Sequence, residues 1–376
     1  MSANNAAYSK NRLPFTLTIV PRERIPRWLP AAISAGAIAL ALVIGGIILA
    51  LVGGNPIAAY RQIARSSFGS LDVFSDTMVK AIPLILVGLA CALAFRMRLW
   101  NIGAEGQFFM GAWGASAVVL IPLVSDTTPA WIVITLMLIA GMLAGALWGF
   151  IPGMLKARFN VNEIISTLML NYIAIAWNDF FIFGVWSESG FQMSRTFPRN
   201  AWLPRLADYA AQVRAFSGLT THLGLLFALV ATIVVWLILE HSRWGYEIRL
   251  IGDNPRAAEY AGVPIARHTV LVLMLSGALA GLAGMSEISG VVHRLQGAIS
   301  PGYGFTGIIV AWLAKLNPFA IILVSILFGA LILAGREIQP SGIPKMIQGI
   351  ILVCLIASDF LLRYRVRIRR RAEDRG

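Results

Sequence analysis

The sequence predicts an all-α integral membrane protein, and two observations carry that prediction. Hydrophobic residues make up 58% of the 376 residues and charged residues only 13%, against about 45 to 50% and about 25% in soluble domains. The apolar residues also gather in uncharged runs of about 20 residues, the length at which a helix crosses about 30 Å of hydrocarbon. One soluble core cannot hold so many apolar groups, so we expect the chain to fold in lipid.

The uncharged apolar windows predict about ten transmembrane helices. The first window has no charge between Trp28 and Arg61, and it is too long for the apolar region of a cleaved signal peptide. The eighth is short and rich in glycine. The ten windows are 29–53, 79–95, 100–124, 130–154, 163–185, 222–239, 269–290, 302–316, 318–335 and 346–362.

The distribution of basic residues predicts the orientation. With ten spans both termini lie on one side, and the loops and tails of that side hold about two thirds of the 31 lysines and arginines. Positive residues accumulate on the cytoplasmic side of membranes. We therefore expect basic cytoplasmic tails at 1–27 and 365–376, a membrane domain at 28–364, an outer loop at 186–221 and an inner loop at 241–268.

Composition also excludes several kinds of site. The net charge of +13 comes from basic residues between apolar runs and at both ends, which favours contact with membrane lipid over binding of nucleic acid. Cys91 and Cys354 lie inside apolar runs, so neither a disulfide framework nor a CxxC metal site is expected. No lysine follows a glycine, so the chain has no GxxxxGK[ST] loop for the phosphates of ATP. We expect no cofactor in this chain and no catalytic residues.

The inner loop encodes a short helix together with both of its ends. Asn254 can cap the free amides, Pro255 suits the first helical position, Gly262 can take the left-handed closing conformation, and Pro264 prevents continuation. A helix of about seven residues is marginal alone in water, so it must pack against its own spans or against a partner protein. The residues that carry this signal are Gly252, Asn254, Pro255, Ala257, Ala258, Tyr260 and Gly262.

This run resembles the cytoplasmic coupling loop of ABC importer permeases. The similarity is to the branch for simple sugars and nucleosides that works with a basic-membrane-protein type lipoprotein. Three further stretches resemble the same branch, and together with the loop they cover about residues 80 to 355. One departure is Ala314-Lys315-Leu316, where that branch more often carries glycine and arginine. The three stretches are 101–107 (NIGAEGQ), 162–172 (NEIISTLMLNY) and 304–311 (GFTGIIVA) with the following Asn317-Pro318.

The resemblance implies the ABC importer permease architecture in the plasma (inner) membrane of a bacterium. It implies a second permease chain, often a paralogue, and an extracytoplasmic solute-binding lipoprotein that delivers the solute. It also implies a cytoplasmic ABC ATPase that uses the ATP and receives the short coupling helix in a groove.

Polar side chains inside the spans are candidates for the lining of a solute pathway, because a charge at mid-membrane costs about 2.5 to 3.5 kcal/mol. Asn171, Asn178 and Asp179 share one broad helix face, and Glu105 stands among glycines. Hydrogen bonding between helices is an alternative role for each of them. Glu287 is expected to reach the outer interface. The candidate pathway residues are Glu105, Gln107, Asn171, Tyr172, Asn178, Asp179 and Phe305.

The expected cargo is a neutral solute, rich in hydroxyls or aromatic, because the four histidines stand at span ends or in loops and form no proton relay. Trp113, Tyr172, Trp177 and Phe305 could stack on a nucleobase, although packing is the commoner role of such residues. Two rival functions remain. One is an ion-coupled secondary transporter of a neutral polar solute, and the other is a membrane-embedded acid–base enzyme, which lacks a second titratable group at a fixed spacing.

Overall fold

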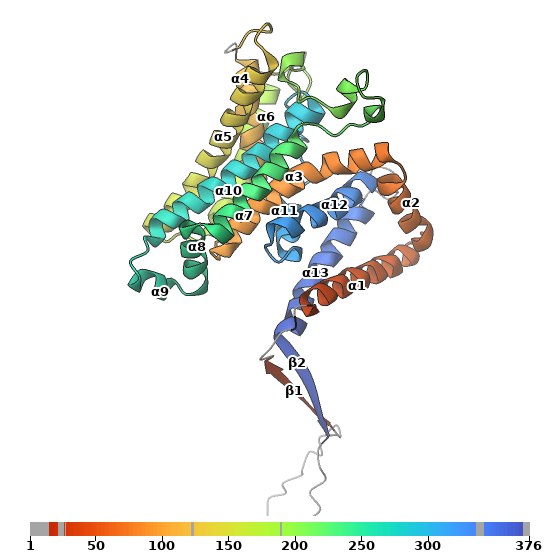
Figure 1. Ribbon diagram of the computed structural model, residues 1–376, viewed down its shortest axis with the longest axis vertical. Coiled ribbons are helices and arrows are strands. Elements are labelled where there is room, and N and C mark those ends of the chain that lie inside the picture. Colours follow the sequence, from red (N-terminus) through yellow and green to blue (C-terminus); the bar gives the residue numbers. More distant parts are fainter. Residues whose placement is uncertain are drawn as a thin grey trace, which may run out of the picture.

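The computed structural model describes residues 15–21, 26, 28–121, 124–188, 190–335 and 342–370 (Figure 1). Strands β1 (Phe15–Pro21) and β2 (Tyr364–Arg370) pair antiparallel, and apart from residue 26 the rest of the predicted tails lies outside the described residues. All other long elements are helices: α1 Leu29–Leu51, α2 Pro56–Phe68, α3 Leu71–Arg96, α4 Ala104–Leu120, α5 Ala130–Phe159, α6 Glu163–Phe183, α7 Gly224–His241, α8 Arg243–Asp253, α9 Pro255–Tyr260, α10 Ile265–Glu287, α11 Tyr303–Leu313, α12 Pro318–Ala334 and α13 Ile343–Arg363.

Among the described helices, six are long and apolar enough to cross a membrane. They are α3, α5, α6, α7, most of α1, and α10 with the π-helical turn Ile288–Val292 that continues it. Helices α11, α12 and the Lys345–Ser358 part of α13 are apolar but shorter. A helix lies in each of the ten predicted windows. The helical membrane fold is therefore confirmed, whereas the count of ten spans stays a prediction.

Two amphipathic helices, α2 and α8, lie outside the predicted windows because charged residues interrupt their apolar face. Asn55 caps α2 by accepting hydrogen bonds from the amides of Ile57 and Ala58, both at 3.1 Å. Ser242 caps α8 by accepting a bond from the Gly245 amide at 2.9 Å. Cap residues of this kind define a helix start without any hydropathy signal, so a search for apolar windows does not find them.

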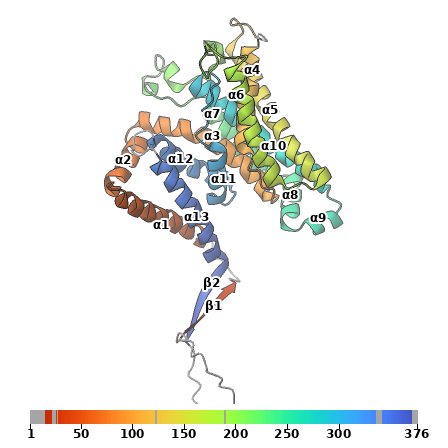
Figure 2. The same ribbon diagram turned by 180° about the vertical axis from the view of Figure 1, so that it is seen from behind.

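Helix α3 is the buried centre of the protein. Its apolar stretch is 94% buried, far more than that of α5 or α6, and it packs against α7, α10, α11 and α12 (Figures 1 and 2). It also begins at Leu71, eight residues before the predicted window, because the side chain of Ser70 accepts a bond from the Val73 amide. A helix enclosed by others has little contact with lipid, so its polar residues can be tolerated.

Helices α4, α5 and α10 pack with their backbones almost in contact. A Cβ atom added to Gly111 of α4 would lie 2.1 Å from the Gly281 Cα atom of α10. One added to Gly145 of α5 would lie 2.2 Å from the Gly277 carbonyl oxygen of α10. Small residues allow such close approach between membrane helices, where dispersion rather than water exclusion drives packing. These three helices therefore form a unit that any side chain at the crossing points would separate.

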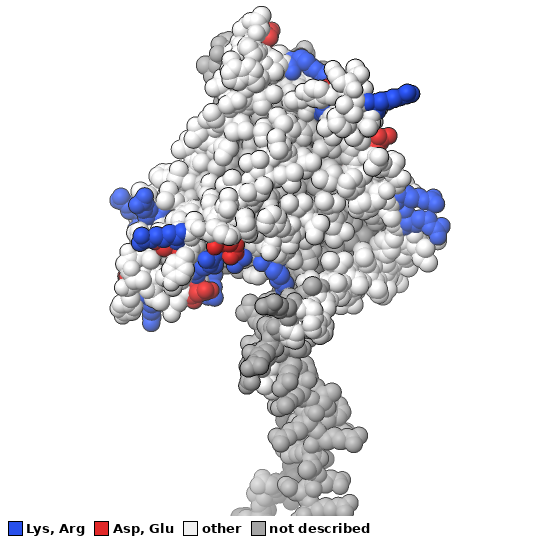
Figure 3. All heavy atoms as spheres, viewed as in Figure 1, with Lys and Arg blue, Asp and Glu red and all other residues white. Residues whose placement is uncertain are grey.

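The surface agrees with a lipid environment. Figure 3 shows a wide band without charged atoms, between basic and acidic groups around α8 and α9 and others near the opposite end. Helices α1 and α13 lie beside each other, apart from the unit formed by α4, α5 and α10 (Figures 1 and 2). The charged band edges mark where lipid headgroups would meet the protein.

Candidate functional site

The loop between α7 and α10 forms helices α8 and α9. The sequence predicts the second of these, the short helix α9. The Asn254 side chain accepts a hydrogen bond from the Ala257 amide at 3.2 Å, and Pro255 occupies the first helical turn. Gly262 has a φ of +74°, in the left-handed region. The predicted start and stop of the short helix are confirmed.

Helix α9 is anchored on one side and exposed on the other. Ala258 is completely buried, whereas Tyr260 is 93% exposed. Gly252 at the end of α8 lies so close to α3 that an added Cβ would be 2.2 Å from the Arg96 carbonyl oxygen. Of the two supports left open by the sequence, the chain's own helices therefore hold Ala258, and Tyr260 is presented outward.

Ion pairs brace the base of this loop. Glu247 of α8 contacts His268 of α10 at 2.9 Å and Arg243 at 3.2 Å. Glu240 of α7 lies 3.7 Å from Arg249. These contacts tie α8 to α7 on one side and to α10 on the other.

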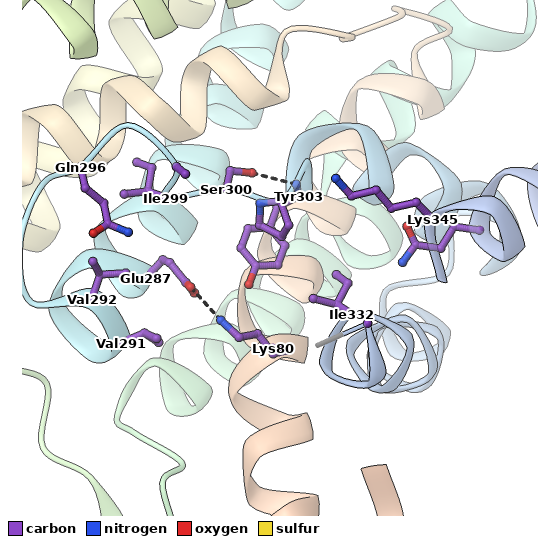
Figure 4. A pocket seen from close by; sticks show the side chains of 14 residues that line it. Lys80, Glu287, Val291, Val292, Gln296, Ile299, Ser300, Tyr303, Ile332 and Lys345 are labelled. Carbon is purple, nitrogen blue, oxygen red and sulfur yellow. Dashed lines mark hydrogen bonds and ion pairs between the residues drawn. The ribbon is translucent and has the colours of Figure 1, made fainter. Parts of the chain in front are cut away.

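A cavity of about 490 Å³ opens between α3, α10, α12 and α13 (Figure 4). Part of its wall comes from residues 293–302, called here the α10–α11 segment, which is non-helical. Non-helical backbone next to membrane helices is tolerated where it lines a polar cavity. The volume falls within the range of about 300 to 1,000 Å³ typical of small-molecule sites. The lining residues are Lys80, Glu287, Val291, Val292, Gln296, Ala298, Ile299, Ser300, Pro301, Tyr303, Ile332, Gly335, Lys345 and Gln348.

A buried ion pair stands in the wall of this cavity. The Lys80 Nζ atom lies 3.0 Å from Glu287 Oε1, and the two side chains are 8% and 4% exposed. The expectation that Glu287 reaches the interface is wrong, because Lys80 of α3 neutralises it within the helical core. Sequence reasoning missed Lys80, which stands at the outer edge of the window 79–95. Its position inside an apolar window could have identified it, because an ionisable residue within a membrane span is by default a candidate functional residue.

Two of the predicted pathway residues make buried hydrogen bonds, Asn171 between α6 and α4, and Gln107 to the non-helical segment that precedes α4. Asn171 of α6 accepts a bond from the Gly106 amide at 2.8 Å and donates to the Ile102 carbonyl oxygen at 2.9 Å. Gln107 of α4 accepts a bond from Asn101 Nδ2 at 2.8 Å. All are buried polar groups whose partners offset the loss of water. The NIGAEGQ and LNY motifs thus hold α4 and α6 together.

Two others hold the α10–α11 segment and the start of α11. The Glu105 carboxylate accepts a bond from the Gly304 amide, and Asn178 Nδ2 donates to the Gln296 carbonyl oxygen at 3.2 Å. The side chains of Gln296 and Ser300 belong to the cavity wall. Glu105 and Asn178 are therefore not cavity-lining residues, but they fix the backbone that lines it.

The remaining candidates lie on the outer surface of the chain. Tyr172 is 65% exposed, Phe305 is 45% exposed, and Asp179 is half-buried. Trp113 and Trp177 pack edge to face with ring centroids 5.6 Å apart. For these two tryptophans the packing interpretation therefore holds, while Tyr172 and Phe305 face outward from α6 and α11.

Arg205 fixes the outer loop to the end of α10. Its Nη2 atom donates to the Gly290 carbonyl oxygen at 2.8 Å and lies 2.7 Å from His293 Nε2. The His293 ring stacks on Trp202 with centroids 3.6 Å apart. Burial, followed by the Arg205 cation, lowers the pKa of His293 to about 4; the Ser289 backbone opposes this lowering, Arg199 adds to it, and Asp208 opposes it. His293 is therefore neutral and accepts the bond from Arg205.

We expect the outer loop to loosen as pH falls from about 6.5, the ordinary pKa of histidine, toward about 4. The folded form resists protonation over this range and the open form does not, so the stabilisation is complete above pH 6.5 and is lost on acidification. Amide hydrogen exchange of residues 197–206 measures the effect. In His293→Phe the stacking surface remains, and protection should depend less on pH than in the wild type. Equal acid sensitivity in both proteins would contradict this role.

Comparison with known proteins places these features in a family. Residues 73–356 match the family described as the permease component of a branched-chain amino acid transport system. A glucose ABC transporter permease of Haloferax volcanii is 34% identical over 94% of both chains. A guanosine ABC transporter permease of Bacillus subtilis is 35% identical over 87% of this chain and 93% of its own length. A nucleoside ABC transporter permease of Lactococcus lactis is 32% identical over 85% and 88%. The chain therefore belongs to the family of multi-pass membrane permease components of ABC transport systems.

Proposed function

We propose that this chain is the membrane-spanning permease of an ATP-driven ABC importer for nucleosides or simple sugars. The observation that carries the proposal is α9, a short capped helix with an anchored Ala258 and a fully presented Tyr260. Such a helix can insert its exposed tyrosine into a groove of a partner protein. Relatives named for guanosine, nucleosides and glucose support the solute class. A cavity whose only buried charges among the described residues neutralise each other suits an uncharged solute.

In this proposal the work is divided among several chains. A cytoplasmic ABC ATPase binds α9 and uses ATP, an extracytoplasmic solute-binding lipoprotein delivers solute, and a second permease chain, a paralogue, completes the pathway. The chain spans the plasma membrane ten times, with both termini in the cytoplasm. Support for this orientation comes from the excess of basic residues in the tails and inner loops.

The solute pathway runs along the exposed faces of α6 and α11 and into the cavity. Tyr172 and Phe305 line the face toward the second permease chain, with Asp179 half-buried behind them. Glu105, Gln107, Asn171 and Asn178 set the spacing of α4, α6 and the α10–α11 segment. Movement of α9 reaches α7 and α10 through α8 and shifts the cavity between outward and inward access.

Reconstitution tests this proposal. The permease pair is placed in proteoliposomes with the ATPase inside and the lipoprotein outside, and uptake of uridine and glucose is measured. We expect uptake to require ATP and every one of these components. Uptake by the permease chain alone, driven by a sodium or proton gradient, would instead identify an ion-coupled secondary transporter.

A further inference from the structure

We propose that Lys80 and Glu287 form a solute subsite that recognises a pair of neighbouring hydroxyl groups, as on a ribose or a hexose ring. The proposal rests on the proposed function for the class of solute and goes beyond it by naming the residues that select the solute. It starts from one carboxylate oxygen. Glu287 Oε1 is paired with Lys80, but Oε2 is buried and has no hydrogen-bond partner among the described residues.

An unpartnered buried carboxylate oxygen needs an explanation, because a buried acceptor that has lost water and gained no donor destabilises the fold. Figure 4 shows Glu287 and Lys80 side by side in the wall of the cavity, with the Tyr303 ring beside them. The Lys80 Nζ atom lies 6.0 Å from the centre of that ring. Because Glu287 lines the cavity, a rotation of its carboxylate presents Oε2 to a donor on a molecule inside the cavity.

The chemistry of the pair defines that molecule. An ionised carboxylate only accepts hydrogen bonds and an ammonium only donates them. A hydroxyl group does both, so one hydroxyl of a diol donates to Glu287 Oε2 while its neighbour accepts from Lys80 Nζ. The pair itself has no net charge, so it favours neither an anion nor a cation, and Lys345, the further charged residue among those that line the cavity, is exposed. Gln296, Ser300 and Gln348 add neutral polar groups to the same wall.

The test compares each solute with an analogue that lacks neighbouring hydroxyls. The pairs are uridine with 2′,3′-dideoxyuridine, and methyl glucoside with methyl 3-deoxyglucoside, in which no two neighbouring ring carbons both carry a free hydroxyl. In the reconstituted complex, Lys80→Met combined with Glu287→Leu removes both charges and leaves no unpaired ion. We expect uptake of the parent solute to fall about tenfold or more, while uptake of the analogue changes less than about threefold. Wild type and variant are measured with the same lipoprotein, so a change in the ratio of parent uptake to analogue uptake must come from the permease.

Two controls isolate the subsite. Lys156→Met combined with Glu163→Leu removes another interhelical ion pair, 3.0 Å long and outside the cavity, and should leave the parent-to-analogue ratio unchanged. Ser325→Ala removes a buried hydroxyl that has no partner among the described residues and does not line the cavity. It should also leave the parent-to-analogue ratio unchanged. Equal loss of parent and analogue in the Lys80/Glu287 variant, or no loss, would overturn the proposal.

A binding measurement separates this proposal from the proposed function. The four compounds are titrated onto the detergent-purified wild-type permease, and protection against thermal unfolding is recorded. Protection by uridine or methyl glucoside and not by its analogue, lost in the Lys80/Glu287 variant, supports the subsite even if ATP-driven uptake fails. Absence of any preference for the hydroxylated compounds overturns the subsite even if the chain proves to be an ABC permease.

Discussion

Replacing Tyr260 by alanine is expected to lower ATP-driven uptake about tenfold or more, since loss of a central tyrosine from an interface commonly costs about 2 kcal/mol or more. Tyr260 is 93% exposed, so the substitution removes no contact within the permease. Its membrane level and melting temperature should match wild type. The measurements are solute uptake, stimulation of the ATPase by the permease, and retention of the ATPase on the purified permease.

Tyr246 of α8 supplies the matched control. It is also an exposed tyrosine, at 59%, but it lies on α8 rather than on α9. Tyr246→Ala should keep most of the uptake. If Tyr260→Ala transports normally, or if it fails only because the protein no longer accumulates, α9 is not the contact that drives transport. Ala258 is a poorer probe because it is buried, so a bulky residue there would disturb the loop before it reached any partner.

Replacing Gly111 by alanine is the stability change with the largest expected effect. The new Cβ would lie 2.1 Å from the Gly281 Cα atom and 2.3 Å from its carbonyl oxygen. Both are backbone atoms, so α4 and α10 must separate along their whole contact. The loss of folding free energy should be larger than the cost of about 1 to 3 kcal/mol that is typical of an overpacked core. Protein level in the membrane and the melting temperature in detergent measure it.

Gly349→Ala is the control for that substitution. Gly349 is also helical, in α13, but an added Cβ meets no atom within 4 Å. It should leave stability unchanged or raise it slightly, because alanine has the higher helix propensity. Similar melting temperatures for the two variants would show that the α4–α10 contact yields more easily than its geometry indicates.

Several features of this protein follow from local sequence alone. The bilayer fold follows from 58% hydrophobic residues in uncharged runs, since hydrogen bonding within a helix is the main way to satisfy a backbone in lipid. Helix α9 follows from Asn254, Pro255 and Gly262, because a cap, a restricted φ and a left-handed φ act within a few residues. The motifs NIGAEGQ and LNY indicate the family for a similar reason, as each is contiguous along the chain.

Tertiary structure alone decided which polar residues meet. The sequence shows that Glu105 and Asn178 need partners, but not that both hold the backbone around the α10–α11 segment. Lys80 and Glu287 stand far apart along the chain, and the choice between reaching water and pairing in the core depends on how α3 and α10 cross. At that crossing Ser276 of α10 donates a hydrogen bond to the Ala90 carbonyl oxygen of α3, a contact that hydropathy and helical spacing do not encode. Composition is enough to identify a membrane protein. Which side chains pair across helices depends on how the helices pack, so only the fold could place the ion pair in a cavity.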